Sequence, residues 1–153
     1  MSEQVQIPAY DGEGTIPAYV ARPAGTPSAA IIVIPEIFGV NPGIRQKCDK
    51  WAEMGYLAVA PDIFWRFAPG VELDPDVDAE LQQAFGYFQQ YDANDGVYDI
   101  EATIKWLRST QGVGKVGDHD CQGLGRAVLA SAQFGNACEI CGVAGQVEAP
   151  QPL

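Results

Sequence analysis

The C-terminal region carries the side chains with the strongest chemistry, one histidine and three cysteines. His119 and Cys121 are separated by one residue, and Cys138 and Cys141 form a Cys-x-x-Cys pair. A structural zinc ion takes four nitrogen and sulfur ligands, and a Cys-x-x-Cys pair lets two thiolates hold one ion. The short His-x-Cys spacing argues against a zinc site, so we predict free thiols and no metal, with zinc as the alternative.

Cys121 is also a candidate nucleophile. A thiol attacks an ester carbonyl when a base takes its proton, and that base normally comes from a separate loop of the fold. His119 precedes Cys121 on the same segment, so its ring would have to turn back over its own backbone. We therefore predict that His119 is an exposed polar residue. A redox role for Cys138 and Cys141 is disfavoured, because no strand precedes them.

Glu36 is a second candidate for chemistry, much earlier in the chain. It follows an apolar run at residues 29–34 and precedes a segment with helical spacing. A carboxylate that follows a buried strand faces the crevice in which α/β proteins bind ligands. Cys48, in contrast, shares an apolar helical face with Ile44 and Trp51, which predicts packing in the core.

Alternating strands and helices would position these residues. Residues 29–34 and 56–60 are continuous apolar runs, which are typical of strands covered on both faces. The spacing of apolar residues predicts helices over 44–54, 77–91 and about 97–108. Such alternation predicts parallel βαβ units.

The N-terminal region differs, because two strand-like runs at residues 5–10 and 15–21 flank the turn residues 11–14. We predict a β-hairpin there. Prolines within both runs remove hydrogen-bond donors, which predicts that both strands lie toward a sheet edge. No strong strand signal follows Val116.

Several short blocks follow one another in order along the first part of the chain. They are Tyr10-Asp11-Gly12, Ile34-Pro35-Glu36-Ile37-Phe38-Gly39-Val40-Asn41, Gly55-Tyr56, Ala60-Pro61-Asp62-Ile63-Phe64, Arg66-Phe67-Ala68-Pro69-Gly70, Leu73-Asp74-Pro75, Gly96-Val97-Tyr98-Asp99-Ile100-Glu101-Ala102 and Gly114-Lys115-Val116-Gly117. Over about residues 5–117 the chain resembles the dienelactone hydrolase family. The resemblance implies a three-layer α/β-hydrolase-like domain, truncated here, with a mostly parallel sheet and an N-terminal β-hairpin.

The resemblance also implies a reaction and its residues. A cysteine attacks a small-molecule ester or lactone, with a histidine as base and an aspartate that orients it, and no metal or organic cofactor takes part. In this chain the nucleophile maps to Cys121 and the acidic residue beside the thiol to Glu36. One of the backbone N–H groups that hold the oxyanion maps to Ile37.

The chain departs from the family where the nucleophile lies. The family pattern Gly-x-Cys-x-Gly-Gly is replaced by His119-Asp120-Cys121-Gln122-Gly123-Leu124, and we find no counterpart of the family's downstream aspartate and histidine. We therefore expect weak hydrolysis or none. Leu81 and Phe85 stand where family members that act on dienelactone carry an arginine and a tyrosine, which favours an ester without a carboxylate.

These departures divide the chain into residues 1–117, an N-terminal part of a hydrolase-like domain, and residues 118–153, a divergent tail. An abrupt loss of resemblance at Gly117 is what a shifted reading frame would produce. The alternative function is that of a truncated, non-catalytic interaction module. An uncovered sheet edge would then favour self-association.

Charge and hydropathy narrow the possible partners. The net charge of −11, from 20 acidic and 9 basic residues, would repel nucleic acid and anionic lipid. No apolar run approaches the roughly 20 residues of a membrane span. The first residues lack the basic and apolar segments of a secretory signal, so we predict a cytoplasmic protein without nucleic-acid or membrane partners.

Overall fold

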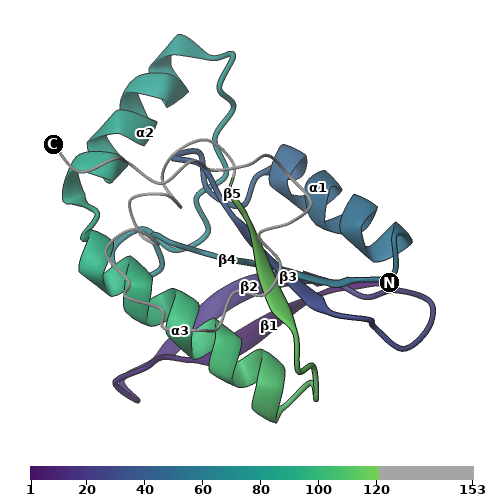
Figure 1. Ribbon diagram of the computed structural model, residues 1–153. Coiled ribbons are helices and arrows are strands. Elements are labelled where there is room, and N and C mark those ends of the chain that lie inside the picture. Colours follow the sequence, from purple (N-terminus) through teal and green to yellow (C-terminus); the bar gives the residue numbers. More distant parts are fainter. Residues whose placement is uncertain (121–153) are drawn as a thin grey trace, which may run out of the picture.

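The computed structural model describes residues 1–120, which form a mixed five-stranded sheet and three helices (Figure 1). The elements in chain order are β1 (Ser2–Pro8), β2 (Thr15–Ala21), β3 (Ala30–Ile34), α1 (Pro42–Glu53), β4 (Leu57–Pro61), α2 (Asp78–Gln90), α3 (Ala93–Ser109) and β5 (Val116–Asp120). The strand order across the sheet is β1-β2-β4-β3-β5. Strands β3, β4 and β5 are parallel, whereas β1 and β2 form the predicted antiparallel hairpin.

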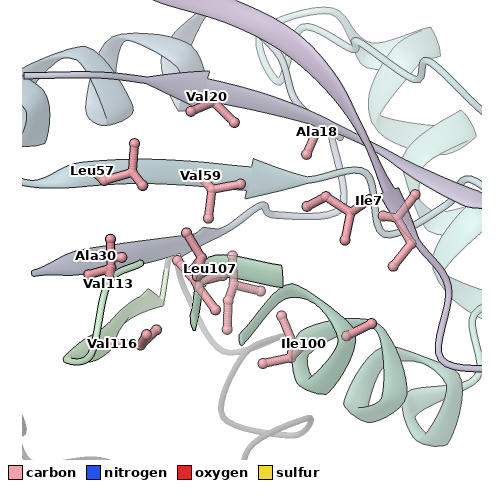
Figure 2. Close-up of a cluster of buried hydrophobic side chains, with 14 of the residues drawn as sticks. Ile7, Ala18, Val20, Ala30, Leu57, Val59, Ile100, Leu107, Val113 and Val116 are labelled. Carbon is pink, nitrogen blue, oxygen red and sulfur yellow. The ribbon is translucent and has the colours of Figure 1, made fainter. Parts of the chain in front are cut away.

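The sheet has one helix on each face, as the predicted three-layer arrangement requires. Side chains of a strand point alternately to opposite faces. Accordingly Ile32 in β3 packs in the cluster that contains Leu107 of α3, and Val33 packs with Ile44 of α1. Figure 2 shows Leu107 and Ile100 on the side of α3 that faces the strands. The continuous apolar run of β3 is therefore explained by burial on both faces.

The ends of α1 follow from local sequence. The Asn41 side chain accepts a hydrogen bond from the Ile44 N–H, which places the helix start before the predicted residue 44. The helix ends before Gly55, whose φ of 93° lies in the left-handed region that glycine adopts without strain. The helices predicted at 77–91 and 97–108 are α2 and α3, the second of which begins earlier, at Ala93.

The predicted placement of the N-terminal strands toward a sheet edge is confirmed, because β1 is the edge strand and β2, which contains Pro17, lies next to it. The ladder with β4 begins at Ala18, and Pro17 contributes its carbonyl, which accepts from the Asp62 N–H at 2.8 Å, so the missing donor costs nothing there. One strand prediction is wrong: a strand continues beyond Val116, because β5 pairs with β3 as far as Asp120.

Helix α2 lies apart from the sheet (Figure 1) and packs against the segment that follows β4. The rings of Phe64 and Tyr87 are 5.7 Å apart between centroids.

No helix among residues 1–120 has the length and apolarity needed to cross a membrane.

Candidate active site

The carboxyl ends of two parallel strands lie level with each other. Ile34, the last residue of β3, pairs with Asp120, the last residue of β5. In open α/β sheets this edge is where ligands bind. Residues 35–41 leave β3 here and connect it to α1, whereas Cys121, Cys138 and Cys141 lie outside the described residues. The predicted nucleophile and the predicted zinc ligands therefore stay predictions.

The loop of residues 35–41 carries both remaining candidates. Glu36 is half-buried, and its Oε1 lies 3.5 Å from Lys47 Nζ. The Gly39 N–H donates to the Glu36 carbonyl at 3.1 Å, which closes a turn around Ile37. Within residues 1–120, the Ile37 N–H donates to no acceptor. Within the described residues, the turn thus presents the Ile37 N–H without an acceptor, next to the Glu36 carboxylate at the carboxyl end of β3.

The segment of residues 71–73 packs directly on this loop. The Leu73 N–H donates to the Phe38 carbonyl at 2.9 Å, and Gly39 forms a β-bridge with Glu72. Gly39 has a φ of 73°, and a Cβ at this position would overlap the Val71 carbonyl. A glycine is required here both by the backbone conformation and by the close approach of the two chains.

His119 does not have the predicted exposed position. Its ring is half-buried on β5 and lies 5.7 Å from the ring of Trp51 in α1, edge to face. The side chain points to the α1 side of the sheet because of strand alternation, and Trp51 occupies that side. The predicted core position of Cys48 is confirmed, since Cys48 is fully buried among α1 and the sheet.

Two aspartates that are buried at this part of the fold were not predicted from the sequence. Asp62 follows β4, and its carboxylate accepts from the Phe64 N–H at 3.0 Å and the Gly70 N–H at 2.8 Å. Burial raises the pKa of Asp62, and these two backbone donors partly offset the rise. Its place directly after a buried strand, like that of Glu36, was the signal available in the sequence.

The second buried aspartate is Asp99 in α3, whose side chain is 2% exposed. Asp99 Oδ2 accepts from Arg66 Nη1 at 2.7 Å and from Trp65 Nε1 at 3.0 Å. Burial raises the pKa of Asp99, and the Arg66 charge opposes that rise. This cluster fixes the segment after β4 to α3.

No group of histidine, cysteine and acidic residues within residues 1–120 has a geometry that would hold a metal ion.

Comparison with known proteins decides the family. The sequence profile of the Dienelactone hydrolase family matches residues 16–137. The chain belongs to this family. The match includes Cys121 and extends beyond Gly117, where we expected the resemblance to end, and the division of the chain at residue 117 stays a prediction.

Among dienelactone hydrolase relatives, the carboxymethylenebutenolidase of Pseudomonas putida is 39% identical over 137 residues, covering 87% of this chain and 57% of that protein. Carboxymethylenebutenolidase 1 of Cupriavidus pinatubonensis (strain JMP 134 / LMG 1197) is 34% identical over 71% of this chain and 46% of its own length. The chain thus spans about half the length of these relatives.

A solved structure confirms the predicted fold class. A Klebsiella pneumoniae protein, provisionally named a dienelactone hydrolase, superposes with a TM-score of 0.65 and 27% sequence identity. The superposition covers 78% of this chain and 49% of that one. The described residues therefore form part of an α/β-hydrolase domain, and the loop of residues 35–41 follows one of its parallel strands.

Proposed function

We propose that this dienelactone hydrolase family member cleaves a carboxylic ester or lactone through Cys121. The Ile37 N–H, which has no acceptor within residues 1–120, carries the proposal. It lies in the turn after β3, and β3 ends level with β5, whose last residue immediately precedes Cys121 in the sequence. An oxyanion hole needs such a backbone donor, fixed in place before the reaction and aimed at the position where negative charge develops.

The reaction follows from these groups. The Cys121 thiolate attacks the carbonyl carbon, a C–S bond forms, and the π electron pair moves onto the carbonyl oxygen, which accepts from Ile37 N–H. When the tetrahedral intermediate collapses, the C–O bond breaks and the alkoxide or phenolate leaves with its electron pair. Water then attacks the thioester, releasing the acid and the thiol. By the resemblance, we propose that Glu36, the residue before Ile37 in the sequence, tunes the reactivity of the Cys121 thiol.

The proposed substrate class rests on the resemblance, in which Leu81 and Phe85 of α2 stand where family members that act on dienelactone carry an arginine and a tyrosine. Both side chains are uncharged, so neither offers positive charge to an anionic group on the acyl chain. We propose an ester or lactone without a carboxylate. A carboxylate-bearing substrate would require a bidentate cationic partner such as arginine.

The test is covalent acetylation by p-nitrophenyl acetate. Peptide mapping by mass spectrometry should place an acetyl group on Cys121, and release of nitrophenolate beyond one equivalent would report turnover of this thioester. Cys121→Ala should abolish the rapid release of nitrophenolate, whereas Cys138→Ala, the same change at another thiol, should preserve it. Equal release of nitrophenolate by wild type and Cys121→Ala would refute the proposal.

The sheet edge supports a second proposal, self-association. Among the strands of residues 1–120, β5 pairs only with β3, so its other edge has no described strand beside it. Exposed strand edges recruit further chains. Gel filtration at several concentrations should therefore give an apparent mass above 16.4 kDa that rises with concentration. A single monomeric mass throughout would refute this association.

A further inference from the structure

The Asn41 side chain makes two hydrogen bonds in opposite directions. Its Oδ1 accepts from the Ile44 N–H at 3.1 Å, which caps α1. Its Nδ2 donates to the Leu73 carbonyl at 3.0 Å, which joins the end of the 35–41 loop to the 71–73 segment. One half-buried amide therefore fixes the helix start and the loop relative to the chain that follows β4.

Neighbouring residues of the loop are fixed in the same way. The Phe38 carbonyl accepts from the Leu73 N–H, and the Val40 carbonyl accepts from Arg45 Nη1 at 2.8 Å. Arg45 Nη1 also lies 2.6 Å from Glu72 Oε1. The Phe38 carbonyl, the Val40 carbonyl and the Asn41 side chain are thus each hydrogen-bonded to α1 or to the 71–73 segment. The Ile37 N–H, in contrast, has no acceptor within residues 1–120.

We propose that Asn41 is a positioning residue that acts through the 35–41 loop to hold the Ile37 N–H where the oxyanion forms. This inference rests on the hydrolytic function proposed above. An oxyanion donor contributes only when it is fixed before the reaction, and a displacement of about 1 Å can cost roughly a hundredfold in rate. Asn41 reaches both elements because an amide combines an acceptor with a donor, a pairing that a carboxylate lacks.

The chemistry of the side chain supplies the variant. Asn41→Asp keeps an oxygen for the Ile44 N–H, so the helix cap remains. The same variant removes the donor to Leu73 and places negative charge against its carbonyl. The matched control is Asp92→Ala, which deletes the side-chain cap that accepts from the Asn94 N–H at the start of α3, far from the loop in sequence.

Two reagents separate the oxyanion hole from thiol reactivity. Acetylation of Cys121 by p-nitrophenyl acetate develops charge on a carbonyl oxygen. Alkylation by iodoacetamide displaces iodide from a saturated carbon and forms no oxyanion. Rates at Cys121 are measured by peptide mapping. Asn41→Asp should lower the acetylation rate about 10- to 100-fold and leave the alkylation rate unchanged, whereas Asp92→Ala should change neither.

Hydrogen exchange of the folded protein gives a readout independent of the reaction. In Asn41→Asp, the hydrogen-bonded backbone amides of Gly39 and Leu73 should exchange faster than in wild type. Unchanged exchange, or an equal loss of both reagent rates, overturns the positioning role. If wild-type Cys121 is not acetylated at all, the proposed hydrolysis is refuted. Faster exchange in Asn41→Asp would then show that Asn41 anchors the loop without serving catalysis. That result would also overturn this inference. Should Asn41→Asp not fold, Arg45→Met, which frees the Val40 carbonyl, is tested in its place.

Discussion

The backbone of Gly39 lies so close to Val71 that a Cβ at residue 39 would overlap the Val71 carbonyl group. Gly39→Ala should therefore lower the free energy of unfolding by about 2–5 kcal/mol, from the left-handed φ and the overlap together. Urea denaturation followed by circular dichroism measures this loss. The close approach also predicts that Gly39→Ala moves the 35–41 loop away from the 71–73 segment.

Gly12 provides the matched control for that substitution. Its φ of 76° equals that of Gly39 within a few degrees, but no atom lies within 4 Å of the position that a Cβ would take. Gly12→Ala should cost only the conformational part, about 1–2 kcal/mol. Equal losses in the two variants would show that contact with Val71 contributes nothing.

Asp62 should make stability fall as the pH rises. Burial raises its pKa in the folded chain, so between the ordinary aspartate value and the folded value the folded state binds more protons than the unfolded state. Below this pH range the contribution of Asp62 to the free energy of unfolding is fully present. The contribution is lost as the pH rises through the range. The stability difference between wild type and Asp62→Asn should shrink from pH 4 to pH 7. Asp76→Asn, the same change at an exposed position, is the control.

Arg66 should stabilise the fold through the charge of Asp99. Arg66→Met leaves the 2%-exposed Asp99 with the Trp65 donor alone, and because the Arg66 side chain is 27% exposed we expect a loss of about 1–3 kcal/mol. Without Arg66 the pKa of Asp99 rises further, so the loss should be greater at pH 7 than at pH 4. Asp95→Asn removes a longer contact of 3.9 Å between more exposed groups and should cost under about 1 kcal/mol. A loss from Arg66→Met that is independent of pH would contradict the role of the charge pair.

Cys48 should resist alkylation in the native protein. The side chain is fully buried, so iodoacetamide reaches it only when α1 separates from the sheet. Mass spectrometry should find Cys48 unmodified in buffer and modified in concentrated urea. Rapid native labelling of Cys48 would mean that α1 opens readily.

Much of the framework could be predicted from local patterns. The apolar runs at residues 29–34 and 56–60 predicted β3 and β4, because burial on both faces demands apolar residues throughout a strand. Helical spacing predicted α1, α2 and α3. The short motifs placed Glu36 and Ile37 together after β3, where the structure has them, and pointed to the family that the profile match confirms.

Tertiary structure alone decided how distant segments meet. It extended β5 to Asp120, because main-chain pairing depends on the neighbouring strand more than on the residues themselves. It also brought Leu73 to Asn41 and Trp51 to His119. Local periodicity and capping act over a few residues, and the sequence therefore determined the elements and the candidate residues. Contacts between residues far apart in the chain exist only once the layers have packed, and for that reason only the folded structure decided how the Ile37 loop is held.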